Sequence, residues 1–221
     1  MNYESNQETG IIYHGHSMFE IRSVNGIKIV TDPYNERIRD RLPDVSADIV
    51  LVSHDHFDHG NVSSVRGNPT VVKSPGVTEL KGIYISGIES YHDTRKGELR
   101  GKNLIFRFIV DGIVFAHLGD LGHSLDAVYL EKLKDVDILM IPVGGTYTVN
   151  FLEASDITEK IKPRIVIPMH YRETDSKLDV DTVNPFLSRW QNIEKKGHSA
   201  SVSKEGIAGT KGTEVWLFDS R

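Results

Sequence analysis

The sequence predicts a layered α/β or α+β domain in which mixed β-sheets are covered by helices. Short apolar runs of strand type recur along the whole chain, and helix-like segments fall between them mainly in the second half. The 221 residues contain no Pro-, Gly- or Ser-rich linker and can bury one sizeable core. We therefore expect a single domain over residues 1–221.

Two β-hairpins are predicted from their turn dipeptides. Asn25-Gly26 separates two β-rich runs within residues 18–32, and Asp111-Gly112 does the same within residues 104–120. The other expected strands are 47–53, 70–75, 82–90, 136–143, 163–169 and 213–218, and the expected helices are 124–135, 153–161 and 182–196.

Composition narrows the range of functions. The chain has 26 Lys and Arg against 31 Asp and Glu, a formal charge of −5, so its surface as a whole is not built for nucleic acid or an anionic membrane. It has no cysteine, which leaves His, Asp and Glu to hold any transition metal. No apolar segment follows a basic start at the N-terminus, and none is long enough to span a bilayer. We expect a cytoplasmic protein, and a homo-oligomer remains open.

Metal-ligand residues follow four separate apolar runs. His54, His92, Asp120 and His170 each come at or just after the end of a predicted strand. If these strands lie in neighbouring sheets, their carboxyl ends form one edge and the four side chains converge there. Layered folds place their binding sites at such edges.

The segment SHDHFDHGN, residues 53–61, has the spacing H-x-H-x-D-H. In an extended segment His54 and His56 point to the same side and can hold one ion. Asp58 and His59 follow where the chain turns, and they can face a second ion. A mixed imidazole and carboxylate cluster without sulfur describes a hydrolytic metal centre.

Here the sequence resembles the metallo-β-lactamase-fold hydrolases. The resemblance rests on SHDHFDHGN, ESYHD, HLGD and IPMHY in the family's order, and it extends to YHGHSMFEI and VTDPY near the N-terminus. The most similar branch is that of small single-domain, ascorbate-phosphate lactonase-like proteins. The resemblance implies a four-layer αββα sandwich of two mixed sheets. It also implies that His54, His56 and His92 hold one metal, that Asp58, His59 and His170 hold the second, and that Asp120 bridges them.

The implied activity is hydrolysis of an ester, lactone or phosphoester bond by a hydroxide shared between two divalent ions. Zinc is the expected metal, with manganese, iron and nickel as alternatives. Asp58 and Asp120 could also accept a proton during turnover. Gly119-Asp120-Leu121 departs from the Gly-Asp-Thr step of many members, and His56 differs from the glutamate usual in the diiron oxygen reductases. His56 therefore favours hydrolysis over redox chemistry.

A local basic strip suggests a small anionic substrate. Cationic side chains follow His92, and phosphate or carboxylate groups suit them. The candidate substrate-binding residues are His16, Arg95, Lys96, Arg100, Lys102, His123 and Arg172. His16 could equally make a structural hydrogen bond, and we expect structural or surface roles for His14, His117 and His198. A phosphodiesterase or nuclease acting on nucleotides or RNA is one alternative, and a non-catalytic metal-containing binding or regulatory protein is another.

Overall fold

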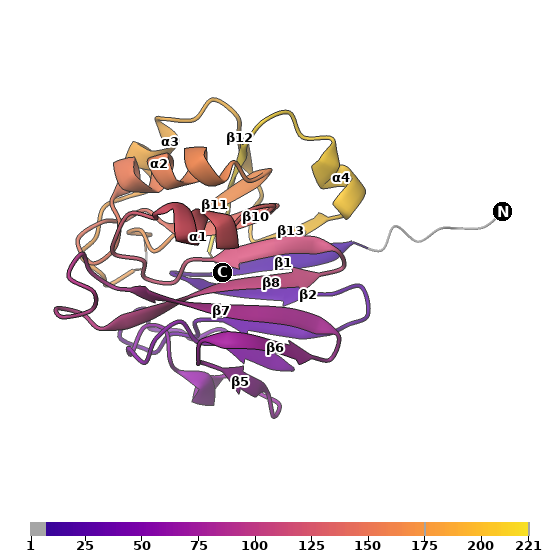
Figure 1. Ribbon diagram of the computed structural model, residues 1–221. Helices are drawn as coiled ribbons and strands as arrows, with labels where there is room; N and C mark the ends of the chain where they lie inside the picture. The colour runs from indigo at the N-terminus through magenta and orange to yellow at the C-terminus, as the bar shows by residue number, and fades with distance from the viewer. Residues whose placement is uncertain (1–7, 175, 221) are drawn as a thin grey trace.

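Two mixed β-sheets pack face to face in the computed structural model, which describes residues 8–174 and 176–220 (Figure 1). The smaller sheet has the order β13(Ser199–Val202), β1(Thr9–Gly15), β2(Met18–Arg22), β3(Lys28–Thr31), β4(Ile49–Leu51) and β5(Thr70–Val72). The larger sheet has the order β12(Ile193–Lys195), β14(Glu214–Leu217), β11(Ile165–Met169), β10(Ile138–Pro142), β9(Ile113–His117), β8(Lys102–Val110), β7(Ile83–Tyr91) and β6(Gly76–Leu80).

Each sheet combines antiparallel and parallel pairs. In the smaller sheet the pairs β13–β1, β1–β2 and β2–β3 are antiparallel, and the pairs β3–β4 and β4–β5 are parallel. In the larger sheet β6 to β9 form an antiparallel meander, and β9, β10, β11, β14 and β12 run parallel. The predicted class of two mixed sheets with helices is confirmed.

Three apolar clusters separate the layers. The central cluster joins the inner faces of the two sheets and includes Ile29 and Leu51 from one sheet and Phe106 and Met140 from the other. Since side chains alternate along a strand, the neighbouring Val30 points instead to the outer face of the smaller sheet. There the covering layer is the chain from Tyr34 to Ala47 and the 3₁₀ turn η1(Val62–Ser64).

Helices cover the outer face of the larger sheet. The helices are α1(Ala127–Lys132), α2(Phe151–Ile161), α3(Asn184–Leu187) and α4(Lys204–Ala208), and the first three contribute to the cluster on this face (Figure 1). The Asn150 side chain accepts hydrogen bonds from the first turn of α2, and the Glu153 carboxylate accepts one from the Asn150 amide, which makes a capping box. Buried Ala154 and Ile157 then fix the face that α2 turns to the sheet.

Both predicted hairpins are present. β2 pairs with β3 across Gly26, whose φ is 83°. β8 pairs with β9 across Asp111 and Gly112, whose φ values of 50° and 76° are both positive. Positive φ at both central residues belongs to the turn that matches the twist of paired strands, which explains why Asp-Gly predicted it correctly.

The predicted helix over 182–196 is wrong for most of its length. Only α3 is helical, with Pro185 in its first turn, and the chain then leaves the helix and adds β12 to β14. Phe186 is fully buried and its ring lies 5.8 Å from that of Trp190, so one helical turn satisfies the apolar residues. The exposed Ile193–Lys195 gains backbone hydrogen bonds as an edge strand instead. Strands β1, β6, β12 and β13 and helix α4 were not predicted.

Among residues 8–174 and 176–220, no helix is both long enough and apolar enough to cross a membrane.

Candidate metal centre

The carboxyl ends of several strands converge on one cluster of histidines and aspartates. His54 follows β4, His92 follows β7, Asp120 follows β9 and His170 follows β11. All four are buried, and three of their ring nitrogens approach the Asp120 carboxylate. The expectation that these strand ends meet at one edge is thus met by the geometry.

Asp120 lies at the centre of the cluster. Its Oδ2 is 3.0 Å from Nε2 of His92 and 3.3 Å from Nε2 of His170, and it is 3.8 Å from Nε2 of His54. Its Oδ1 is 3.1 Å from Nε2 of His59. One carboxylate therefore contacts side chains of both sets of ligands that the sequence assigns to two metals.

The first set, His54, His56 and His92, brings one nitrogen from each ring within 4.8 Å of the others. The segment from 53 to 59 consists of bends and a turn rather than the extended chain expected from its spacing. The rings of His54 and His56 nevertheless lie side by side, with centroids 4.4 Å apart. His56 is exposed, so this set borders on solvent.

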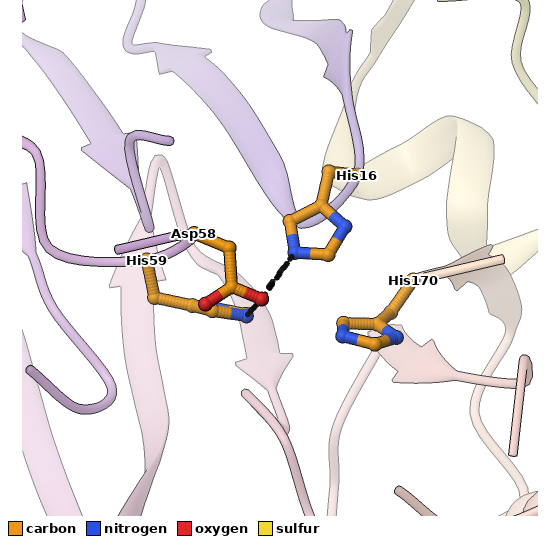
Figure 2. A group of neighbouring side chains, drawn as sticks. All are labelled: His16, Asp58, His59 and His170. Atoms are coloured by element: carbon orange, nitrogen blue, oxygen red, sulfur yellow. Dashed lines mark hydrogen bonds and ion pairs between the residues drawn. The ribbon is translucent and has the colours of Figure 1, made fainter. Parts of the chain in front are cut away.

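The second set contains Asp58, His59 and His170 and is joined by His16. One ligand atom from each of the four lies within 4.8 Å of the others, and Figure 2 shows the side chains pointing toward a common centre. Nε2 of His59 is 3.6 Å from Oδ2 of Asp58. Nε2 of His16 is 3.2 Å from Nε2 of His59 and 3.4 Å from Oδ2 of Asp58. This set is buried.

The cluster fits a cation because several of its polar atoms lack partners. Among the described residues, Nε2 of His54 and Oδ1 of Asp58 are buried without a hydrogen bond. Burying a polar atom without a partner is costly, and natural proteins avoid it. Imidazole nitrogens and carboxylate oxygens are ligands for zinc-like ions, and these unpartnered atoms belong to both sets. A metal ion would satisfy them.

Burial and neighbouring charges set the pKa values in the cluster. Burial lowers the pKa of His54 to about 3 and that of His16 to about 4, so both rings are neutral near pH 7, the state that binds metal. Burial also opposes charge on His59 and Asp120. In His59 the surrounding carboxylates outweigh it and raise the pKa well above its usual value. In Asp120 the nearby histidines hold the pKa well below its usual value.

Asp32 orients one ligand of each set, and sequence reasoning missed it. Its Oδ2 accepts a hydrogen bond from Nδ1 of His59 at 2.8 Å and from the Ser53 hydroxyl at 2.7 Å. The Ser53 oxygen in turn lies 2.9 Å from Nδ1 of His54. Both histidines are thereby held with Nε2 facing the cluster. An aspartate directly after an apolar strand, within the TDP step, was the available signal.

Close backbone packing surrounds the cluster. Asn103 is fully buried and its Oδ1 accepts a hydrogen bond from the Asp120 amide at 2.9 Å, which fixes the bend after β9. A Cβ on Gly144 would lie 2.2 Å from the carbonyl oxygen of His170, and one on Gly122 would lie 2.3 Å from the carbonyl carbon of His92. These two glycines therefore allow the backbone to pack closely behind the cluster.

The basic strip lies on the loop between β7 and β8. Arg95, Lys96 and Arg100 are exposed on this loop, which begins next to His92. Oxygens of the Asp93 carboxylate accept hydrogen bonds from four backbone amides of the loop, those of Arg95, Gly97, Leu99 and Arg100. The Arg100 guanidinium lies 5.4 Å from the ring centroid of Tyr147. The strip is therefore held on an ordered loop.

The other two cationic candidates have different surroundings. Nζ of Lys102 donates to Oε2 of Glu89 at 2.9 Å across the β7–β8 ladder. Arg172 is exposed and lines a groove with residues 182–184 and 217–220, outside the cluster. Their predicted roles in substrate binding stay predictions.

Four histidines are engaged by other groups. Nδ1 of His123 donates to the Ser124 carbonyl while Nε2 accepts from the Tyr91 amide, so this ring has a structural role. Substrate binding by His123 stays a prediction. His117 is fully buried and donates to the Ser17 carbonyl. The remaining two are buried His14, which lies 3.3 Å from Glu20, and exposed His198, which donates to the Asp219 carbonyl.

Comparison with known proteins agrees with this fold and cluster, which together define a protein of the metal-dependent hydrolase class. The sequence model of the β-lactamase superfamily domain matches residues 10–170. This chain belongs to the metallo-β-lactamase superfamily. A UPF0173 protein of Pyrococcus furiosus is 32% identical over 73% of this chain and 82% of that protein. A UPF0173 metal-dependent hydrolase of Carboxydothermus hydrogenoformans is 31% identical over 73% of this chain and 84% of that protein.

Solved structures show the same relationship. A Thermotoga maritima protein assigned to the Zn-dependent hydrolases of the metallo-β-lactamase superfamily is 33% identical, with a TM-score of 0.79 over 96% of this chain and all of that one. A protein of Parabacteroides distasonis, at 18% identity and a TM-score of 0.68, shares the fold over 100% of this chain and 97% of its own.

Proposed function

We propose that this protein is a hydrolase that uses two divalent metal ions to cleave an ester, lactone or phosphoester bond of a small anionic substrate. The observation that carries the proposal is the position of Asp120, whose two oxygens contact histidines of both ligand sets. Zinc is the expected ion, with manganese, iron or nickel as alternatives. We also propose that residues 1–221 form a single domain, that the protein is cytoplasmic and that it is a member of the lactonase-like branch.

The ligands divide into two groups that share Asp120. His54, His56 and His92 hold the ion nearer to solvent. Asp58, His59 and His170 hold the ion deeper in the protein. Asp32 keeps His54 and His59 in the tautomer that exposes Nε2 to the ions, directly for His59 and through the Ser53 hydroxyl for His54.

Two cations held here would supply Lewis acidity and would lower the pKa of a bound water molecule toward about 7. The protein's own groups do the rest. Asp58 and Asp120 hold carboxylate oxygens in the cluster, where either can take a proton from the attacking water. The buried strands behind the cluster exclude bulk solvent from one side, while exposed His56 marks the side open to substrate.

The basic strip supplies the affinity for an anionic group. Arg95, Lys96 and Arg100 stand on the loop that begins at His92, a ligand of the outer ion. Guanidinium groups can bind phosphate or carboxylate through two parallel hydrogen bonds. A substrate with its reacting bond at the ions and a charged group on this loop would use both features.

Metal analysis combined with a substrate panel tests the proposal. Purified protein is stripped with a chelator, reconstituted with zinc or manganese, and analysed for metal per chain. The same preparations are assayed with lactone, thioester, phosphodiester and β-lactam substrates, with Asp120→Ala as the inactive control. We expect two ions per chain and metal-dependent turnover of a carboxylic ester, lactone or phosphoester.

Other outcomes would change the assignment in defined ways. A maximum of one ion would overturn the two-ion site. Turnover limited to phosphodiesters would favour the alternative of a phosphodiesterase or nuclease. Two bound ions without turnover of any substrate in the panel would favour a metal-containing binding or regulatory protein.

A further inference from the structure

His16, which the sequence offers as a candidate for substrate binding, lies among the proposed metal ligands Asp58, His59 and His170. It lies in the turn between β1 and β2, far along the chain from the other cluster residues. It is nevertheless only 1% exposed and reaches the second ligand set, which surrounds the inner ion. Its ring centroid lies 4.4 Å from that of His170 and 4.9 Å from that of His59. Figure 2 shows the ring directed at the same centre as Asp58, His59 and His170.

The distances among three of these side chains match those of ligands on one ion. Two atoms that each lie about 2.0–2.2 Å from a zinc ion are roughly 2.8–3.6 Å apart when the angle at the metal is about 90–110°. The Nε2 of His16, the Nε2 of His59 and the Oδ2 of Asp58 are separated by 3.2, 3.4 and 3.6 Å. The triangle therefore has the dimensions of one face of a coordination sphere.

A hydrogen-bond network satisfies the three atoms less well than a cation does. Nε2 of His16 and Nε2 of His59 are 3.2 Å apart, so only one of the two rings can carry a proton toward the other. Oδ2 of Asp58 lies 3.4 Å from the first nitrogen and 3.6 Å from the second, so this single proton cannot serve both of its neighbours fully. A cation at the centre accepts electron pairs from all three at once.

His16 is the first of the two residues that turn the chain from β1 to β2, a position where tight hairpin turns take a positive φ and favour glycine or asparagine over histidine. Its φ is 56°, a region that non-glycine residues rarely occupy. The preceding Gly15 has a φ of 100°, and a Cβ there would lie 2.7 Å from the Arg39 guanidinium carbon. Strained backbone of this kind persists only where the surroundings enforce it, and it is concentrated at functional sites.

The surroundings of His16 do enforce it. Its amide donates to Oε2 of Glu173 at 3.0 Å, and Nη2 of Arg39 donates to the same oxygen at 2.6 Å. Its carbonyl accepts from the Tyr13 hydroxyl at 3.0 Å and from the His170 amide at 2.8 Å. Side chains of Glu173 and Tyr13 therefore fix both backbone polar groups of His16. The backbone hydrogen bond from His170 also ties His16 directly to a proposed ligand.

We propose that His16 is an additional ligand of the inner ion, beside Asp58, His59, His170 and Asp120. This inference rests on the proposed two-ion site. It gives the inner ion five protein ligands, all of them buried, whereas the outer ion has four, His54, His56, His92 and Asp120, and faces solvent through His56. The inner ion is therefore the slowly exchanging one, and the outer ion receives the substrate.

The test compares wild type with His16→Asn, since asparagine tolerates positive φ but is too short to reach the ion. His198→Ala, at an exposed histidine outside the cluster, is the matched control. Each protein is stripped of metal and titrated with cobalt, whose visible absorption reports ligand number. Zinc retention is then followed in competition with a chelator.

We expect wild type and His198→Ala to lose one ion quickly and one slowly. His16→Asn should lose the slow phase, bind one ion at least about tenfold more weakly and show an altered cobalt spectrum. An unchanged spectrum together with wild-type affinity for both ions would overturn the proposal. If wild type bound only one ion, the two-ion function would fail, while the cobalt spectrum of His16→Asn would still decide whether His16 holds that ion.

A second measurement avoids the variant altogether and therefore decides the question even if His16→Asn does not fold. Wild-type protein with isotope-labelled histidine is loaded with NMR-active cadmium. Coupling between cadmium and Nε2 of His16 would support coordination. Its absence, when couplings to the other histidines are seen, would overturn it.

Discussion

The carboxylate of Asp32 and the imidazole of His59 form a fully buried hydrogen-bonded pair, with 2.8 Å between Oδ2 and Nδ1. Asp32 itself has a φ of 41°, so its backbone is strained in order to place the carboxylate behind the cluster. The same carboxylate accepts from the amide and the hydroxyl of Ser53. Asp32 thus fixes the orientation of His54 and His59, one residue from each proposed ligand set, from behind the cluster.

Asp32→Asn should weaken metal binding while preserving the fold. Asparagine tolerates the positive φ, but it lacks the charge that makes His59 a stronger ligand. We expect about 10- to 100-fold weaker binding of at least one ion, measured by competition with a chelator. Asp111→Asn is the matched control, because Asp111 also has a positive φ of 50° and accepts hydrogen bonds from Thr9 and Val24, away from the cluster. Equal metal affinity in the two variants would contradict the orienting role.

Asp120→Ala should remove activity more completely than the loss of a ligand to one ion. Its oxygens contact histidines of both sets, so its loss affects both ions together. We expect a fall in kcat/KM of more than about 1,000-fold, equivalent to several kcal/mol of transition-state stabilisation. Circular dichroism should show the wild-type fold, since Asp120 follows β9 and lies outside the apolar clusters. Turnover at the wild-type rate would rule out the mechanism.

Removal of metal should lower the thermal stability. Ions that bind only the folded state add about 2.7 kcal/mol for each site at a free concentration 100 times the Kd. For a chain of this size the midpoint of unfolding should fall by about 5–10 °C for each ion removed, measured by calorimetry with and without chelator. The Asp120→Ala variant should show a smaller fall. A wild-type midpoint that does not respond to chelation would argue against ions held by buried ligands.

Gly144→Ala should displace the backbone of His170 and so shift its ring within the cluster. The added Cβ would lie 2.2 Å from the His170 carbonyl oxygen, a backbone atom that cannot move alone. We expect a loss of about 1–3 kcal/mol in the free energy of unfolding, measured with denaturant, together with weaker metal binding. Gly10→Ala is the control, since its nearest contact would be an ordinary 3.5 Å to Arg22. Equal free energies of unfolding for the two variants would show that the loop containing Gly144 can move to accommodate the added methyl group.

The sequence predicted the strand-end ligands because each follows directly on an apolar run that forms a buried strand. His54 and His170 owe their positions to β4 and β11, and no distant contact is needed to foresee where they point. His16 is different. Its backbone is held by Glu173, 157 residues away, and its left-handed conformation has no local signature beyond the preceding glycine. The sequence therefore offered His16 only as a candidate for substrate binding, and its place beside His59 and His170 becomes visible when the two sheets are packed together.

The fold could be predicted from the sequence to a similar extent. Dipeptides with an intrinsic preference for tight turns gave both hairpins, whereas the segment 182–196 contains helix-forming residues and still forms β12. There the competing interaction is an unpaired edge of β14, which comes later in the chain and pairs Val215 with Ile193. Local preference is overridden where a nearby sheet edge offers backbone hydrogen bonds.

Replacing the cationic residues of the β7–β8 loop should raise KM for an anionic substrate without changing kcat. Arg100 should have the larger effect, because its contact with Tyr147 limits the positions of its guanidinium group and so reduces the entropy lost on binding. Lys102 should have the smaller effect, because its ammonium group already pairs with Glu89. Since these side chains are exposed, we expect increases in KM of about two- to fivefold for each alanine variant.

Kinetics at low and high salt separate an electrostatic effect from a change in loop structure. Screening should raise KM for wild type and shrink its difference from Arg100→Ala, because exposed charges lose their influence beyond about 10 Å at 0.1 M salt. Arg164→Ala is the matched control, since Arg164 precedes β11 and therefore lies at the sheet edge opposite His170. If Arg95→Ala, Lys96→Ala and Arg100→Ala all keep the KM of Arg164→Ala, the basic strip is a solvated surface and the substrate's charge is bound elsewhere.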